Sequence, residues 1–327
     1  MIQFRSILNN ELADFLELRK VSKSQSAYKH DRHTLQNFDE YLCSINCETK
    51  NLMESQMVGW VRTLTGKSSS IANVVIVIRI FLEHLLSYGI HAYIPPIPKV
   101  SDDYVPYIFS DDEIDMIFSI VDTLPMGRFQ KNTLIHVEYP MILRLMYGCG
   151  LRIGETLALK IKDVDFNTGV LTLNYTKGNK QRRVPMHPTL TEILKKYCMA
   201  LGMVGYPEAY LFPTADPTVS VSIHSAGYQF NNILKLGNIS LSNRQKHQRG
   251  PCMHCLRHVF VFKSFANAEK NGRRIDDAIP YLSIYLGHDS LKETEKYLKF
   301  SSELFPEAMK IFDDYTAEIF PEVKYDE

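Results

Sequence analysis

The stretch that decides the fold reads Tyr285-Leu286-Gly287-His288-Asp289-Ser290-Leu291-Lys292-Glu293-Thr294-Glu295-Lys296-Tyr297 and lies near the end of the chain. A histidine stands in a tight Leu-Gly-His turn, and a tyrosine follows nine residues later on what the pattern predicts to be the next helix. Taken alone, a tyrosine on a polar helix is typical of an amphipathic surface. The stretch gains its meaning from motifs that precede it in the chain.

Three motifs lie upstream of this stretch. They are Gly148-Cys149-Gly150-Leu151-Arg152-Ile153-Gly154-Glu155, the lysine-rich turn Tyr175-Thr176-Lys177-Gly178-Asn179-Lys180, and His254-Cys255-Leu256-Arg257-His258. An arginine at a glycine-flanked helix start can present its planar fork to an anion. The alternative for Arg152 is a surface side chain paired with Glu155, one turn further on. His254 and Arg257 stand at i and i+3, which predicts that they share one face of a helix.

The lysine-rich turn is predicted to form the tip of a β-hairpin. Residues 170–175 alternate β-branched and apolar side chains, and 181–185 would form the return strand. A hairpin tip can carry a lysine into a DNA groove. A solvated, charged hairpin is equally compatible with the spacing.

The order Arg, Lys, His-x-x-Arg, His and Tyr resembles the tyrosine recombinase (phage integrase) family in its short two-domain form. The resemblance implies a catalytic set of Arg152, Lys177, His254, Arg257, His288 and Tyr297. In this set the tyrosine attacks a DNA phosphate and forms a 3′-phosphotyrosyl link. The two arginines clamp the phosphate, the lysine serves as general acid, and the histidines bond the phosphate and help to move the tyrosine proton. Glu155 is expected to orient a catalytic partner.

The first third of the chain is predicted to be helical. Apolar residues recur at helical spacing in 8–18, 24–42, 54–64 and 68–88. The resemblance implies a core-binding domain that grips the DNA duplex, whereas a generic four-helix bundle is the alternative from the pattern itself.

Three prolines in four residues, Pro95, Pro96 and Pro98, cannot continue a helix and predict an extended connector. The predicted domains are a helical core DNA-binding domain at 1–93, a linker at 94–107 and a catalytic domain at 108–327, whose C-terminal helix the resemblance implies is exchanged between subunits. The expected fold class is mainly α with a small β-hairpin or sheet (α+β).

The charge of the chain is balanced, with 37 basic and 37 acidic side chains. A nucleic-acid binder usually shows a basic domain, so any DNA contact must come from local basic clusters. The predicted DNA-contacting residues are Lys67, Lys180, Arg182, Arg183, Arg244, Lys246 and Arg249.

Metal binding and membrane insertion are not expected. Cys252-Met253-His254-Cys255 resembles half of a zinc site, but a structural site needs a second ligand pair, for which Cys43 and Cys47 are the candidates in another predicted domain. We therefore expect no metal, no cofactor and reduced thiols. The longest apolar run, 71–81, is short for a bilayer and contains Arg79, so a cytoplasmic location away from membranes is expected.

The leading hypothesis is a site-specific recombinase that acts on double-stranded DNA as a homotetramer on two sites, through a Holliday junction, in integration, excision or resolution. An accessory DNA-bending protein would be an additional partner. One alternative is a type IB-like topoisomerase, which shares the chemistry but needs only a monomer. Others are a DNA-binding protein that has lost cleavage, and a metal-dependent nuclease, for which no carboxylate cluster accompanies these motifs.

Overall fold

The protein divides into two compact units, Met1–Asp103 and Tyr104–Glu327, and the division falls inside the predicted linker at 94–107. The computed structural model describes residues 4–100, 106–124, 134–174, 181–239 and 250–298. Each unit has its own hydrophobic core.

The described residues of the first unit, 4–100, form four helices, as the sequence predicts. They are α1 (Asn9–Ser22), α2 (Gln25–Ser44), α3 (Glu54–Thr63) and α4 (Ser68–Leu85), followed by a single 3-10 turn, η1 (Leu86–Tyr88). An aromatic group ties α2, α3 and α4 together, because the ring of Phe38 makes edge contacts with Trp60 at 5.2 Å and with Phe81 at 6.2 Å between centroids. Offset and edge-to-face pairs of this kind add to the stabilisation from buried area.

Helix α4 is the most apolar of these helices. Together with the turn that follows, it is long and apolar enough to cross a membrane by length and composition alone. Val75, Ile78 and Phe81 on this helix are fully buried in the core of the first unit. Its apolar face is therefore accounted for by packing against α1 and α2.

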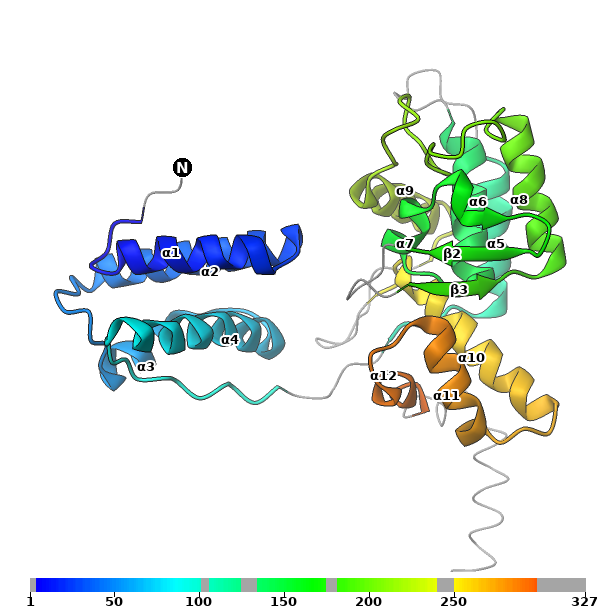
Figure 1. Ribbon diagram of the computed structural model, residues 1–327. Helices are drawn as coiled ribbons and strands as arrows, with labels where there is room; N and C mark the ends of the chain where they lie inside the picture. The colour runs from blue at the N-terminus through cyan, green and yellow to red at the C-terminus, as the bar shows by residue number, and fades with distance from the viewer. Residues whose placement is uncertain (1–3, 101–105, 125–133, 175–180, 240–249, 299–327) are drawn as a thin grey trace, which may run out of the picture. The chain divides into compact units, whose positions relative to one another are not determined.

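Where the structure describes it, the second unit is mainly helical and contains one small sheet (Figure 1). Its helices are α5 (Asp111–Asp122), α6 (Ile135–Cys149), α7 (Ile153–Ala158), η2 (Ile161–Asp163), α8 (Pro188–Ala200), α9 (Ile223–Leu236), α10 (His254–Lys270), α11 (Ile275–Leu286) and α12 (Leu291–Glu295). Helix α5 begins at the capping box that Ser110 and Glu113 form, each side chain bonding the other residue's backbone N–H.

The sheet has three antiparallel strands in the order β1 (Val164–Asp165), β2 (Val170–Leu173) and β3 (Arg182–Pro185). Leu171 on the central strand pairs with Val164 on one side and with Val184 on the other, and all three are buried. The sequence predicts the hairpin of β2 and β3. It indicates only a turn where β1 lies, because two residues are too few to show an alternating pattern.

Two helices begin one turn earlier than the sequence suggests. The pattern predicts helix starts near 139 and 279, where Pro140 and Pro280 would stand in the first turn, a position that favours proline. The structure extends both helices through the proline, from Ile135 and from Ile275. Buried side chains on both sides of each proline keep the helix continuous despite one missing hydrogen-bond donor.

A small hydrophobic cluster packs the end of the described chain against α10 and α11. It consists of Val261, Phe262 and Phe265 of α10, Ile279, Leu282 and Leu286 of α11, and Tyr297. The sequence predicts Tyr297 on the last helix, but α12 ends at Glu295 and Tyr297 lies in the turn that follows.

Candidate active site

The carbonyl oxygen of Leu286, at the end of α11, is the point where two of the candidate arginines meet. Arg257 Nη2 donates to it at 2.8 Å and Arg152 Nη1 at 3.4 Å. The chain can turn away here because Gly287 adopts the left-handed conformation, with φ of 65°. Arg152 and Arg257, distant in sequence, are thus held side by side.

Arg257 is almost completely buried, with a side chain that is 1% exposed. Its Nη1 donates to the carbonyl of Gly150 at 2.7 Å, and its Nη2 also lies 3.0 Å from Nε2 of His288. Burial and the neighbouring charge of Arg152 lower the pKa of Arg257 from 12.5 to about 10, so it remains cationic at neutral pH. The guanidinium is therefore locked in place by the ends of α6 and α11.

Arg152 immediately precedes α7 and is more accessible, with a side chain 24% exposed. Its backbone N–H donates to Glu155 Oε2 and its Nη1 to Oε1, both at 2.9 Å. The sequence offers this pairing with Glu155 as the alternative to a functional role. The pairing with Glu155 is present, and the same guanidinium also reaches the carbonyl of Leu286 beside Arg257.

Glu155 also holds a third arginine. Arg182 Nη1 and Nη2 donate to its two carboxylate oxygens at 2.9 and 2.8 Å, and Arg182 Nε donates to the carbonyl of Tyr285 at 2.9 Å. The side chain of Arg182 is only 10% exposed. This placement differs from the DNA-contacting role expected from the sequence, because the guanidinium fork is already occupied within the protein.

The three arginines outnumber the one carboxylate, so the site carries a net positive charge. Burial alone would raise the pKa of Glu155, but hydrogen bonds from Arg182 and the backbone of Arg152, with the charges of both arginines, lower it to about 2. Glu155 is therefore ionised at neutral pH and acts as an internal counter-ion. A cationic cluster of this kind, part of it accessible, is suited to an anion such as a phosphate diester.

Glu155→Gln is expected to destabilise the second unit by about 3 kcal/mol, because it leaves buried guanidinium groups without their counter-charge. Urea unfolding measures this. Glu208→Gln is the matched control, since Glu208 also bonds two cations, Lys160 at 3.0 Å and Lys162 at 2.7 Å, but is 67% exposed. Surface pairs contribute little, so the control should unfold like the wild type. Equal effects of the two substitutions would contradict the proposed counter-ion role.

Gly287→Ala is expected to disturb Arg182. A Cβ at Gly287 would lie 2.8 Å from Arg182 Nη1, in addition to the strain of a left-handed φ. Gly272→Ala is the control, because Gly272 has φ of 71° but nothing within 4 Å of its Cβ position. Both variants should lose about 1–2 kcal/mol from the backbone conformation. Only Gly287→Ala should also lower the rate of the DNA cleavage that the family resemblance implies; equal rates in both variants would mean that Arg182 tolerates displacement.

His288 connects Arg257 to the start of the last helix. Because arginine can only donate, Nε2 of His288 must accept the hydrogen bond from Arg257, which leaves the proton on Nδ1. Nδ1 then donates to Oγ1 of the buried Thr294 at 2.7 Å. Burial, and then the charges of Arg257, Arg152 and Arg182, lower the pKa of His288 to about 3. His288 is therefore neutral and orients Arg257.

The stability of the second unit is expected to decrease as the pH falls. Between pH 6.5 and about 3 the unfolded chain protonates His288 while the folded chain does not, so protons favour unfolding. Glu155 adds to this below pH 4.5, since its folded-state pKa is about 2. Urea unfolding from pH 7.5 to 5 measures the His288 part. His288→Asn should unfold with less pH dependence in that interval, and an unchanged slope would contradict this assignment.

Tyr297 is held by a residue that sequence reasoning did not single out. Nδ1 of His258 lies 2.9 Å from the Tyr297 hydroxyl, and both side chains are buried. The ring of Tyr297 also stacks on His288, with centroids 6.5 Å apart. The available signal was that His258 stands four residues after His254 on the same helix. His254 itself is exposed, and its ring contacts that of His258 at 4.8 Å.

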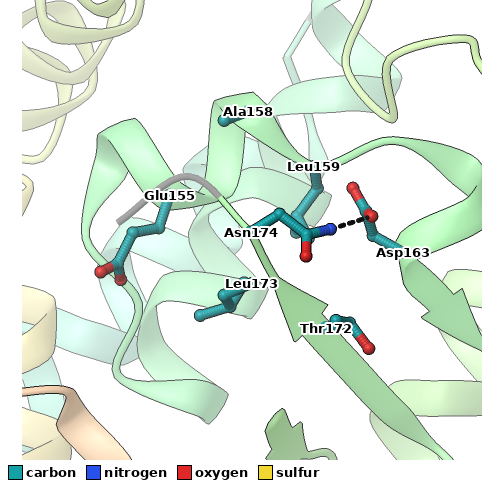
Figure 2. Close-up of a pocket in the computed structure, with 7 residues that line it drawn as sticks. All are labelled: Glu155, Ala158, Leu159, Asp163, Thr172, Leu173 and Asn174. Carbon is teal, nitrogen blue, oxygen red and sulfur yellow. Dashed lines mark hydrogen bonds between the residues drawn. The ribbon is translucent and has the colours of Figure 1, made fainter. Parts of the chain in front are cut away.

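The predicted lysine Lys177 lies outside the described residues, but the two residues that flank its segment are joined. Asn174 Nδ2 donates to Asp163 at 2.7 Å, and the side chain of Gln181 donates to Asn174. Figure 2 shows Asn174 and Asp163 lining a small pocket beside Glu155. Asn174 and Gln181, the described residues on either side of Lys177 in the sequence, therefore lie close to Glu155 and Arg182.

The predicted DNA-contacting residues fall into three groups. Lys67, at the start of α4, and Arg183, on β3, are exposed. Arg182 is committed to Glu155. Lys180, Arg244, Lys246 and Arg249 lie outside the described residues, as does the predicted C-terminal exchange helix.

Comparison with known proteins decides the class of this site. Residues 109–303 match the phage integrase family. The chain belongs to the phage integrase family. It is a site-specific DNA recombinase of the tyrosine type, as the order of its motifs predicted. The chain is 30% identical to the putative integrase/recombinase y4rB of Sinorhizobium fredii over 244 residues, which cover 71% of this chain and 74% of that protein. It is 24% identical to tyrosine recombinase XerC of Vibrio vulnificus over 310 residues, which cover 89% and 86% of the two chains.

Solved structures share the fold of this recombinase. The XerH recombinase in a post-cleavage complex with a palindromic difH substrate matches with a TM-score of 0.68 at 18% identity, over 92% of this chain and 84% of that one. The lambda integrase dimer bound to a COC′ core site matches with a TM-score of 0.65 at 14% identity, over 89% and 76%. The predicted fold class, mainly helical with a small sheet, is thereby confirmed.

Proposed function

We propose that this recombinase cuts and rejoins double-stranded DNA with Tyr297 as nucleophile, at a phosphate held by Arg152 and Arg257. The observation that carries the proposal is the meeting of both guanidinium groups on the carbonyl of Leu286, just before His288 in the chain. Two donors fixed in this way can bind both non-bridging oxygens of one phosphate.

The chemical steps follow from the residue types. The Tyr297 oxygen attacks phosphorus, the bond to the 5′ oxygen breaks, and a 3′-phosphotyrosyl link conserves the energy of the diester bond. Lys177 supplies the proton to the leaving 5′ oxygen, and the arginines stabilise the charge that develops in the transition state. Religation runs the same steps in reverse with an incoming 5′ hydroxyl. None of these steps requires a metal or ATP.

Two histidines and Glu155 support this centre. His288 holds Arg257 through its Nε2, and we propose that the exposed His254 hydrogen-bonds a phosphate oxygen. Glu155 keeps Arg152 oriented and balances part of the positive charge. The exposed Lys67 and Arg183, with the basic residues of 244–249 and Lys180, are proposed to contact the DNA backbone.

We propose that four copies act together on two DNA sites and exchange strands through a Holliday junction, with help from a DNA-bending protein where the site requires it. The lambda integrase dimer solved on a core site supports assembly on DNA. We also propose a cytoplasmic location, because that compartment holds the DNA of bacteria such as those of the curated relatives. Light scattering by the protein–DNA complex measures how many copies of the chain assemble on the DNA. A complex with a single copy after cleavage would favour topoisomerase-like action.

Covalent trapping tests the central proposal. The purified protein is mixed with nicked duplexes that tile the DNA flanking its own gene, in EDTA and without ATP. A nick just downstream of the cleavage position lets the short fragment that begins with the new 5′ hydroxyl diffuse away, so the covalent complex accumulates. We expect a protein–DNA adduct that resists SDS, and peptide mapping should place the nucleotide on Tyr297.

The outcomes of this experiment separate the candidates. An adduct on Tyr297 at one position of the DNA supports a site-specific recombinase and identifies its target. Binding to these duplexes without any adduct would reject the cleavage proposal in favour of a DNA-binding role. If cleavage is absent in EDTA and appears only when Mg²⁺ is added in excess, the protein is a metal-dependent nuclease.

A further inference from the structure

The hydroxyl of Tyr297 has a defined partner in the structure. His258, on α10, places Nδ1 2.9 Å from the Tyr297 oxygen. His258 is 6% exposed and Tyr297 is 7% exposed, so the hydrogen bond lies inside the protein. A buried hydrogen bond between a proposed nucleophile and an imidazole is the arrangement from which proton transfer can proceed directly.

Aromatic rings enclose this pair. Phe262 makes an edge contact with the Tyr297 ring at 5.7 Å between centroids, and His288 stacks on the same ring. On the other side, the ring of His254 meets that of His258 edge-on at 4.8 Å. His258 therefore lies between the exposed His254 and the buried Tyr297.

Three other groups of the site, Arg257, His288 and Glu155, are poorly suited to accept this proton. Arginine cannot act as a base, which excludes Arg257. Both ring nitrogens of His288 are engaged, by Arg257 and by Thr294, and the pKa of His288 is about 3. The oxygens of Glu155 are engaged by arginines.

We propose that His258 is the catalytic base that takes the proton of Tyr297. This inference rests on the proposed function. As the Tyr297 oxygen forms its bond to phosphorus, the phenolic proton passes to Nδ1 of His258. The bond from phosphorus to the 5′ oxygen breaks with its electron pair, and that oxygen takes a proton from Lys177. In religation the protonated His258 returns its proton to the departing tyrosine oxygen.

The physical need for such a base is clear from the reference acidities. A phenol with a pKa of about 10 is neutral near pH 7 and a weak nucleophile, while imidazole has a reference pKa of about 6.5. The phenolic proton becomes far more acidic as the oxygen bonds to phosphorus, so its transfer to imidazole turns favourable during the attack. A positioned base typically contributes about 10²–10⁴-fold to the rate.

The test compares two nicked substrates in single-turnover cleavage. One carries the natural 5′ oxygen at the scissile bond, and the other carries sulfur there, which leaves as a thiolate without needing a proton. His258→Asn keeps a hydrogen-bond acceptor near Tyr297 but cannot take its proton. We expect this variant to cleave both substrates about 10²-fold more slowly than the wild type, in line with the loss of a general base. Lys177→Ala should be slow only on the oxygen substrate.

Two controls accompany this test. His187→Asn makes the same substitution at an exposed histidine. The ring of His187 accepts a hydrogen bond from the backbone N–H of Thr189 at the start of α8, and asparagine can replace it in this role. The cleavage rate of this variant should therefore equal that of the wild type. DNA affinity and thermal unfolding establish that each variant is folded. If His258→Asn does not fold, His258→Ala with added imidazoles replaces it, and the restored rate should rise with the basicity of the imidazole.

Several results would overturn the inference. Wild-type cleavage by folded His258→Asn would remove His258 from the reaction. If the sulfur substrate restores the cleavage rate of this variant, His258 would instead help to protonate the leaving 5′ oxygen. Rescue of His258→Ala that is independent of basicity would reduce its role to filling space. If the wild type itself forms no adduct, it is the proposed function that has failed, before the role of His258 is reached.

Discussion

Replacing Tyr297 by phenylalanine is expected to abolish the covalent protein–DNA adduct completely while leaving DNA affinity unchanged. The substitution removes the one atom that would bond to phosphorus and keeps the ring, which packs against Phe262 and among the residues of α10 and α11. The lost hydrogen bond to His258 should cost about 1 kcal/mol of stability, since that is the typical net contribution of such a bond. Gel electrophoresis in SDS measures the adduct, and a mobility shift measures binding.

Tyr285→Phe is the control for this substitution. Tyr285 is a second tyrosine of the same region, and its hydroxyl contacts the carbonyl of Pro185 at 3.3 Å. This variant should form the adduct at the wild-type rate. An adduct that persists in Tyr297→Phe and disappears in Tyr285→Phe would show that the nucleophile had been misassigned.

Replacing Arg257 by lysine should lower the cleavage rate by about 10²–10³-fold, because one fixed donor to the reacting group in comparable sites contributes about that much. Arg257 spans Gly150, Leu286 and His288 at the same time. A lysine ammonium is a single point donor and cannot reproduce this planar fork. Single-turnover cleavage of the nicked substrate at saturating protein measures the effect without interference from DNA binding.

Arg144→Lys is the matched control. Arg144 also donates through both terminal nitrogens, to Asp122 at 2.8 and 2.7 Å, but it joins α6 to α5 away from the arginine cluster. Its substitution should leave cleavage unchanged. A loss of similar size in both variants would mean that Arg257→Lys acts through general stability rather than through the phosphate.

Much of the site could be predicted from local features of the sequence. The flanking glycines of Arg152 predict its place at a helix start, and the Leu-Gly-His pattern predicts the turn at Gly287. The β2–β3 hairpin follows from alternation and a turn of glycine and asparagine. These features depend on residues within one or two turns of each other, so neighbouring residues are enough to specify them.

The assignment of roles within the cluster required long-range packing. Arg182 and Arg183 are neighbours with the same charge, yet one is bound to Glu155 and the other is exposed, because strand residues alternate between two faces. The spacing of His254 and Arg257 predicts one shared helix face, but Arg257 is buried while His254 faces solvent. The difference arises because α10 packs against α6 and α11 only along part of its circumference.

The sequence by itself determined the kind of chemistry: the order of its arginine, lysine, histidine and tyrosine motifs indicated the family and a phosphotyrosyl mechanism. Only the tertiary structure decided which side chains touch. The hydrogen bond between His258 and Tyr297 and the sharing of Leu286 by Arg152 and Arg257 join segments that are far apart in the chain. Such contacts form when buried surfaces pack, and the spacing of residues along one helix carries no information about the helix that will lie against it.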